Sequence, residues 1–164
     1  MKDNKKIILR IVLTSVTALF IAWIYSNSLK NAEESTAQSG KVLSLIREVF
    51  AFLFPKSDLV ISMHFVRKAA HFCEYAMLGF LFFYTLKSYD IQTLLSSAIA
   101  WTASIAVAFL DEGLQFFSEG RAPAMLDVGI DALGALCGVI AAATLLFIAV
   151  AIIKRRKRKR ESEE

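Results

Sequence analysis

The sequence predicts an all-α integral membrane protein: a bundle of four transmembrane helices with one amphipathic helix at the outer membrane interface. Of the 164 residues, 56% are hydrophobic, and the mean hydropathy of +0.53 is too high for an ordinary soluble domain. Four apolar segments approach the length of about 20 residues that a helix needs to cross a bilayer. They are residues 7–25, 69–86, 91–110 and 132–153.

Basic residues gather at the two ends of the chain. Four lie within the first ten residues, and seven form the unbroken run from Lys154 to Arg160. The positive-inside rule therefore predicts a multi-pass protein with both termini, and the short connection 87–90, in the cytoplasm. Residues 26–68 and the turn 111–126 then face outside. These basic ends indicate contact with anionic lipid, and since no nucleic-acid motif accompanies them, we expect no nucleic-acid partner.

On these grounds the chain divides into four parts. Residues 1–25 form a basic segment and the first transmembrane helix, and residues 26–56 an external linker with the amphipathic helix. Residues 57–153 form a core with three transmembrane helices, and residues 154–164 a basic cytoplasmic tail. The first apolar run is long for a signal peptide and no A-x-A-like site follows, so we expect an uncleaved anchor.

The external linker has two halves of different character. Residues 26–40 are polar and fit either a flexible linker or a helical extension of the first span. From Lys41 onward, apolar residues recur at helical spacing: Val42, Leu45, Ile46, Val49, Phe50 and Leu53. This pattern predicts an amphipathic helix of about three turns, ended by Pro55, in the outer interface or packed over the bundle. It would serve as a plain lid or guide a substrate.

The sequence also marks the boundaries of the later helices. Ser57 or Asp58 is predicted to cap the second spanning helix. We expect the third to continue to about Ser118 before the helix breaker Gly120. Pro123 suits the first turn of the fourth helix.

Polar side chains lie near the outer end of each of these three helices. Arg67, His71 and Glu74 share one face of the second spanning helix, while Lys68 lies to the side and reaches towards lipid headgroups. Asp111 and Gln115 share a face of the third helix. The fourth carries a stripe composed of Asp127, Asp131, Gly134 and Gly138. Because small residues at this spacing let helices approach closely in lipid, the stripe is predicted to face protein.

Together, these helices are expected to bring nine polar groups to the outer membrane level. They are Arg67, His71, Glu74, Asp111, Glu112, Gln115, Arg121, Asp127 and Asp131. A charged side chain at a helix centre costs about 2.5–3.5 kcal/mol on insertion scales, so intramembrane ionisable residues are functional by default. Nine such groups exceed what helix packing requires, which favours a ligand site.

The first hypothesis is a site that binds or modifies an anionic envelope amphiphile. Arg67 or Arg121 would hold a phosphate or carboxylate, since the guanidinium binds two oxygens at once. The catalytic candidates are His71, Glu74 and Asp111, and the choice between binding and turnover stays open. The remaining ligand-binding candidates are Lys68, Tyr75, Glu112, Gln115, Asp127 and Asp131.

Three alternatives compete with this hypothesis. The cluster is structural if its groups only fix the helices. A metal-dependent hydrolase would join His71 and Glu74 with Asp111 or Asp127, but HExxH, a second nearby histidine and a cysteine pair are all missing from the sequence. We therefore predict no bound metal and no other cofactor. Transport is disfavoured because the third helix and the inner half of the fourth lack a polar path.

Three ordered motifs resemble the VanZ-like family of small bacterial membrane proteins. They are RKAAHFCEYAMLGF from Arg67, DEGLQFF from Asp111 and GRAPAMLDVGIDALGALCG from Gly120, and the similarity covers residues 64–139. The matched positions are Lys68, His71, Glu74, Tyr75, Asp111, Glu112, Gln115, Arg121, Asp127 and Gly134. The chain departs from the family at Asp131, where asparagine is common.

This resemblance implies a place in the bacterial cell membrane and a link to the cell envelope. The family is named for a member connected with resistance to the glycopeptide teicoplanin, so antibiotic resistance is an expected role. A lipid-linked cell-wall precursor or another anionic amphiphile in the bilayer is the implied partner. The resemblance does not supply a mechanism.

Overall fold

The computed structural model describes residues 2–53, 62–118 and 124–162. In this part of the chain every regular element is helical: α1 (Lys2–Ser28), α2 (Ala32–Leu53), α3 (Met63–Ser88), α4 (Thr93–Gln115) and α5 (Met125–Glu161). Among these helices, α1, α3, α4 and α5 are long and apolar enough to cross a membrane. The predicted all-α bundle of four spans is confirmed.

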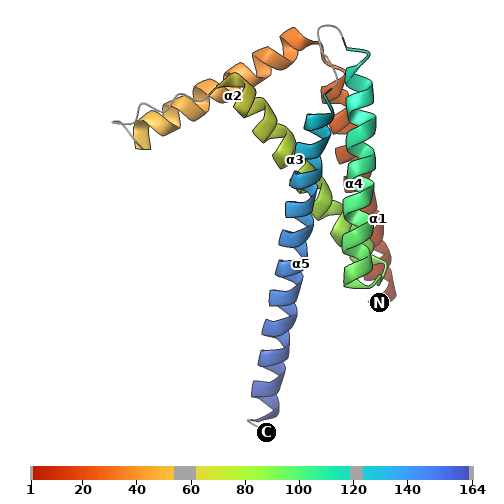
Figure 1. Ribbon diagram of the computed structural model, residues 1–164. Helices are drawn as coiled ribbons and strands as arrows, with labels where there is room; N and C mark the ends of the chain where they lie inside the picture. Colours follow the sequence, from red (N-terminus) through yellow and green to blue (C-terminus); the bar gives the residue numbers. More distant parts are fainter. Residues whose placement is uncertain (1, 54–61, 119–123, 163–164) are drawn as a thin grey trace.

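In the bundle of spanning helices, α1 and α4 lie side by side and α3 crosses α5 obliquely, whereas α2 projects away from one end (Figure 1). We call this end, where α1 and α4 finish and α3 and α5 begin, the α2 end. The opposite end, with the first turns of α1 and the turn between α3 and α4, is the basic end. Both chain termini lie on the side of the basic end (Figure 1), and α5 continues as a helix through the run of basic residues to Glu161.

The polar stretch 26–40 is largely helical and is interrupted by a turn. The last residue of α1 is Ser28, and α2 already begins at Ala32. The Asn31 side chain accepts a hydrogen bond from the Glu34 backbone N–H at 2.8 Å, which satisfies one of the free donors of the first turn of α2. The sharp turn after Ser28 allows α2 to leave the direction of the bundle.

The amphipathic helix therefore starts well before Lys41 and packs chiefly against α3. Of its apolar residues, Leu43 is buried, whereas Val42, Leu45 and Ile46 remain exposed. An apolar face left open in this way is expected for a helix that lies in the membrane interface.

The start of α3 differs from the sequence prediction. Its first turn is capped by Ser62, whose hydroxyl accepts a hydrogen bond from the Phe65 backbone N–H at 3.2 Å. The predicted caps Ser57 and Asp58 lie outside the described residues, as do Pro55, Gly120 and Pro123. The last residue of α4 is Gln115, and the chain then turns towards Ser118.

Close packing of α3 against α5 holds the bundle together. A Cβ atom added at Gly134 or Gly138 would overlap the backbone carbonyl groups of Phe72 or Ala76 on α3. The reverse contact is equally close, because a Cβ at Gly79 would overlap the carbonyl group of Ala135. The glycine stripe thus faces protein, as the sequence predicted, and Asp131 on the same stripe is buried.

Candidate functional site

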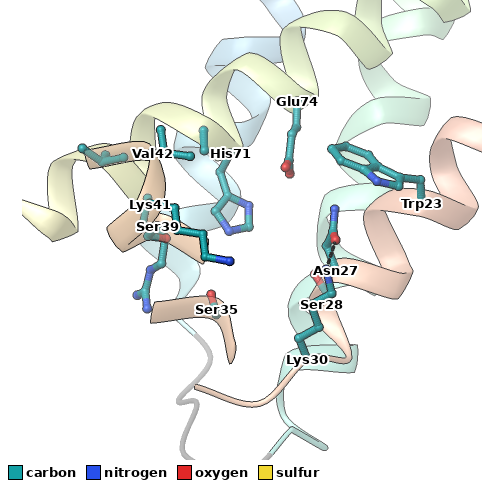
Figure 2. A pocket seen from close by; sticks show the side chains of 13 residues that line it. Trp23, Asn27, Ser28, Lys30, Ser35, Ser39, Lys41, Val42, His71 and Glu74 are labelled. Atoms are coloured by element: carbon teal, nitrogen blue, oxygen red, sulfur yellow. Dashed lines mark hydrogen bonds between the residues drawn. The ribbon is translucent and has the colours of Figure 1, made fainter. Parts of the chain in front are cut away.

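A pocket of about 570 Å³ lies at the α2 end, between the last turns of α1, the first half of α2 and the first turns of α3. The His71 ring and the Glu74 carboxylate of α3 point into this space, and Trp23 borders it from α1 (Figure 2). The lining residues are Trp23, Asn27, Ser28, Lys30, Ser35, Ser39, Lys41, Val42, Val66, Arg67, Ala70, His71 and Glu74.

The charged groups of this pocket are mostly cationic. Among the described residues, Lys30, Lys41 and Arg67 line it together with one carboxylate, that of Glu74. The Lys30 ammonium donates a hydrogen bond to Asn27 Oδ1 at 2.7 Å (Figure 2). In the described part of the chain, none of the three cations forms an ion pair. The pocket therefore carries an excess of positive charge beside the apolar surfaces of Trp23 and Val42.

Behind the pocket, α4 and α5 bury a group of polar side chains. The exposed fractions are 1% for Asp111, 6% for Glu112, 9% for Gln115 and 2% for Asp131. Asp111 and Gln115 lie one turn apart on α4, as their spacing predicted. None of these four side chains lines the large pocket.

His71 connects the pocket to this buried group. Its Nδ1 lies 3.9 Å from Asp131 Oδ1, a separation too long for a hydrogen bond. His71, Asp111 and Asp131 each offer one nitrogen or oxygen atom, and these atoms all lie within 4.8 Å of one another. Three spanning helices thus bring one imidazole and two carboxylates to a single point.

Two other polar contacts tie the beginning of α5 to its neighbours. Lys68 donates a hydrogen bond to Asp127 Oδ1 at 2.5 Å, and both side chains are mostly buried. The expectation that Lys68 reaches lipid headgroups is therefore wrong, because its ammonium turns towards α5. The Glu112 carboxylate accepts a hydrogen bond from the Ala124 backbone N–H, just before α5 begins.

Tyr75 is fully buried one turn beyond His71. Its ring belongs to a core cluster with Ile24 of α1, Val107 of α4 and Val128 of α5. Its hydroxyl has no hydrogen-bond partner within the described ranges. Such a group is unusual because buried polar atoms are generally paired.

The structure thus separates the predicted site residues into two layers. Arg67, His71 and Glu74 line the pocket, while the buried layer contains Tyr75, Asp111, Glu112, Gln115 and Asp131. Lys68 and Asp127 form an ion pair at its edge, and together with Arg67, His71 and Asp131 they border a narrow crevice. Arg121 lies outside the described residues.

Sequence reasoning missed the pocket residues that α1 and α2 contribute. Lys30, Ser35 and Ser39 belong to the polar stretch that fitted a linker, and Lys41 was assigned to the polar face of an interfacial helix. The sequence does contain one indication of these pocket residues, because Lys30 and Lys41 lie among serines directly after a spanning helix. The position of this segment over α3 depends on the turn at residues 29–31, which the sequence pattern did not predict.

These features define a helical membrane protein with a cationic pocket at one end of its spanning bundle. The model of the VanZ/LLP1 family matches residues 7–149, which is most of the chain. The protein therefore belongs to the VanZ/LLP1 family. Comparisons with curated proteins and with solved structures found no match.

Proposed function

We propose that the protein binds the anionic head group of an envelope amphiphile in the pocket between α1, α2 and α3. The observation that carries this function is the placement of Lys30, Lys41 and Arg67 around one space of about 570 Å³. Arginine binds two anionic oxygens at once, and the lysines add point charges, so a phosphate is the best-suited group.

The surroundings of the pocket support an amphiphile as the ligand in preference to a free ion. The apolar residues Trp23, Val42 and Val66 line the same pocket and suit the first part of an alkyl chain. Val42 lines the pocket, and the exposed Leu45 and Ile46 follow it at helical spacing on the same face of α2. A lipid can therefore place its head group in the pocket while its chain stays in the bilayer.

The distribution of basic residues supports an outward-facing pocket. Seven basic residues follow one another from Lys154 to Arg160 beyond the basic end. By the positive-inside rule this end lies in the cytoplasm, so the α2 end faces the cell envelope. A lipid-linked cell-wall precursor has both an anionic head group and a long chain, and the family's connection with a glycopeptide favours it as the ligand.

Fluorescence of Trp23 provides the test, because its indole lines the pocket. In a Trp101→Phe background, Trp23 is the only tryptophan. A brominated alkyl phosphate added to the purified protein should quench its emission saturably, whereas the brominated alcohol of equal chain length should quench it weakly. Arg67→Gln and Lys41→Gln should each weaken phosphate binding about tenfold.

Lys6→Gln is the matched control, since it also removes one positive charge but lies at the basic end. It should leave the affinity unchanged. Equal quenching by the alcohol and the phosphate would rule out recognition of the head group. Unchanged affinity in Arg67→Gln and Lys41→Gln would show that the anion does not bind in this pocket.

The resistance phenotype implied by the family is tested separately in a sensitive Gram-positive host. Wild type should raise teicoplanin resistance, and Glu74→Gln at equal membrane abundance should not, because it alters the one carboxylate that the described residues contribute to the pocket. Equal resistance from both chains would favour a purely structural role for Glu74. If wild type does not protect the host, the protein has no role in teicoplanin resistance. The proposal of head-group binding does not depend on that result.

A further inference from the structure

We propose that His71, Asp111 and Asp131 bind one divalent cation at the junction of α3, α4 and α5. This site lies behind the pocket and goes beyond the binding of an anionic head group, which requires no metal. His71 lines the pocket and belongs to the cation site as well. The two sites are therefore neighbours with different charge preferences.

The separations of the ligand atoms suit a metal ion. His71 Nδ1 and Asp131 Oδ1 are 3.9 Å apart, and all three ligand atoms lie within 4.8 Å of one another. Nitrogen and carboxylate ligands stand about 2.0–2.2 Å from an ion such as Zn²⁺, so two of them are at most about 4.4 Å apart. Small side-chain shifts bring the three atoms to these distances.

The buried hydroxyl of Tyr75 is a second, independent sign of a ligand at this junction. The side chain is 0% exposed, and the described part of the chain offers its hydroxyl no hydrogen bond. The ring belongs to the same core cluster as Val107 of α4 and Val128 of α5, each of which lies about one turn from Asp111 or Asp131.

The helical register also places Tyr75 beside the proposed site. Tyr75 follows His71 by one turn of α3, so the two side chains lie on the same face of this helix. A water molecule on the bound cation, or a carboxylate that holds it, would give the hydroxyl its hydrogen-bond partner. The same arrangement would orient the aspartates around the ion.

Within the described ranges, the close group consists of His71, Asp111 and Asp131, and the neighbouring carboxylates lie outside it. Asp127 pairs with Lys68, and Glu112 accepts the Ala124 backbone N–H. Glu74 lines the pocket and does not belong to the close group. The set therefore differs from the H-x-x-E pairing of His71 with Glu74 that the sequence offered.

A cation here offsets the cost of holding two carboxylates in the bundle. The exposed fractions of Asp111 and Asp131 are only 1% and 2%. A divalent ion shared by both would bring two positive charges to carboxylates that are held away from water. One imidazole with two carboxylates suits Zn²⁺, Mn²⁺ or Fe²⁺.

Direct metal binding to the purified full chain tests this site. The protein is prepared without a polyhistidine tag, stripped with a chelator and titrated with Mn²⁺ or Zn²⁺ in the absence of added lipid. Wild type should bind one ion per chain. Asp131→Asn should lower the affinity on the order of 100-fold, because a neutral amide replaces an anionic ligand.

Asp90→Asn is the matched control, since it makes the same change at the basic end, where Asp90 is about two-thirds exposed. It should bind the metal as wild type does, and circular dichroism should show that both variants are folded. A folded wild type that binds no ion, or an Asp131→Asn variant with wild-type affinity, would overturn the proposal.

A spectroscopic signature keeps the test decisive if Asp131→Asn does not fold. In a His64→Gln background, His71 is the only histidine of the chain. Pulsed electron paramagnetic resonance of the Cu²⁺-loaded protein should then detect one imidazole nitrogen. Its absence would overturn the site. The alkyl phosphate titration is carried out with chelator present. A negative result for metal binding therefore leaves the result for phosphate binding unchanged, and the two proposals are tested separately.

Discussion

The two ends of the bundle hold their charged side chains in different ways. At the basic end, Arg10 donates hydrogen bonds to Asp90 Oδ2 at 3.1 Å and to the Ser88 carbonyl oxygen at 2.8 Å. It also lies 5.1 Å from the centre of the Tyr89 ring. Asp90 is about two-thirds exposed, so these contacts lie at the surface.

At the α2 end, by contrast, carboxylates are buried and cations line an open space. Asp111 and Asp131 are almost inaccessible, while Lys30, Lys41 and Arg67 surround the pocket. Ion pairs at the basic end join α1 to the turn between α3 and α4. At the α2 end, Lys68 pairs with the mostly buried Asp127, while Asp111 and Asp131 lie deeper in the bundle than the cations that line the pocket. The comparison shows that charged side chains at the basic end join helices through exposed contacts. At the α2 end, burial and the separation of the charges matter more than surface pairing.

The largest expected effect concerns the α3–α5 contact that holds both ends in place. Gly138→Leu should abolish folding, because its Cβ alone would overlap the backbone carbonyl of Ala76 and backbone atoms cannot move aside. Overpacking typically costs about 1–3 kcal/mol even where side chains yield. Gly129→Leu is the matched control, since no atom lies within 4 Å of its Cβ position. The yield of monodisperse protein measures the effect, and equal yields would refute this packing.

The next largest effect concerns the ion pair between Lys68 and Asp127 at the α2 end. Lys68→Met should destabilise the protein by about 1–3 kcal/mol, because it leaves the mostly buried Asp127 without its cation. Thermal unfolding of the single and double variants measures the pair. Adding Asp127→Leu should restore part of the loss. Strictly additive losses would show that the two side chains do not interact.

A smaller effect concerns the geometry of the anion pocket. Arg67→Lys keeps the charge but loses the planar fork, so its affinity for the alkyl phosphate should fall about tenfold. Arg10→Lys makes the same change at the basic end and should have no effect on the affinity. Titration of Trp23 fluorescence measures both variants. Equal affinities would show that the pocket uses Arg67 as a point charge only.

The smallest effect is expected at Asp90. Asp90→Asn should change the free energy of unfolding by less than about 1 kcal/mol, because exposed ion pairs contribute little. Arg10 would keep its hydrogen bond to the Ser88 carbonyl oxygen. The same thermal measurement checks this value. A loss as large as that of Lys68→Met would remove the distinction between the two ends.

Local patterns in the sequence determined the spanning helices and the face of each helix on which its polar residues lie. The four spans follow from runs of apolar residues, since a bilayer admits only helices or closed barrels. The helical period placed Asp131 on the same stripe as Gly134 and Gly138, and this stripe does face α3. Both inferences depend on residues close in sequence, for which helix geometry fixes the relative positions.

Only the tertiary structure decided which of these groups meet. Lys68 and Asp127 are 59 residues apart in sequence, and their pairing depends on how α3 and α5 pack. Lys30 and Lys41 reach the pocket because the turn after Ser28 carries α2 to α3. His71 lies beside Asp131 across the helix contact. Helical periodicity assigns a side chain to a face of its own helix, but the partner on that face is chosen by packing between distant segments.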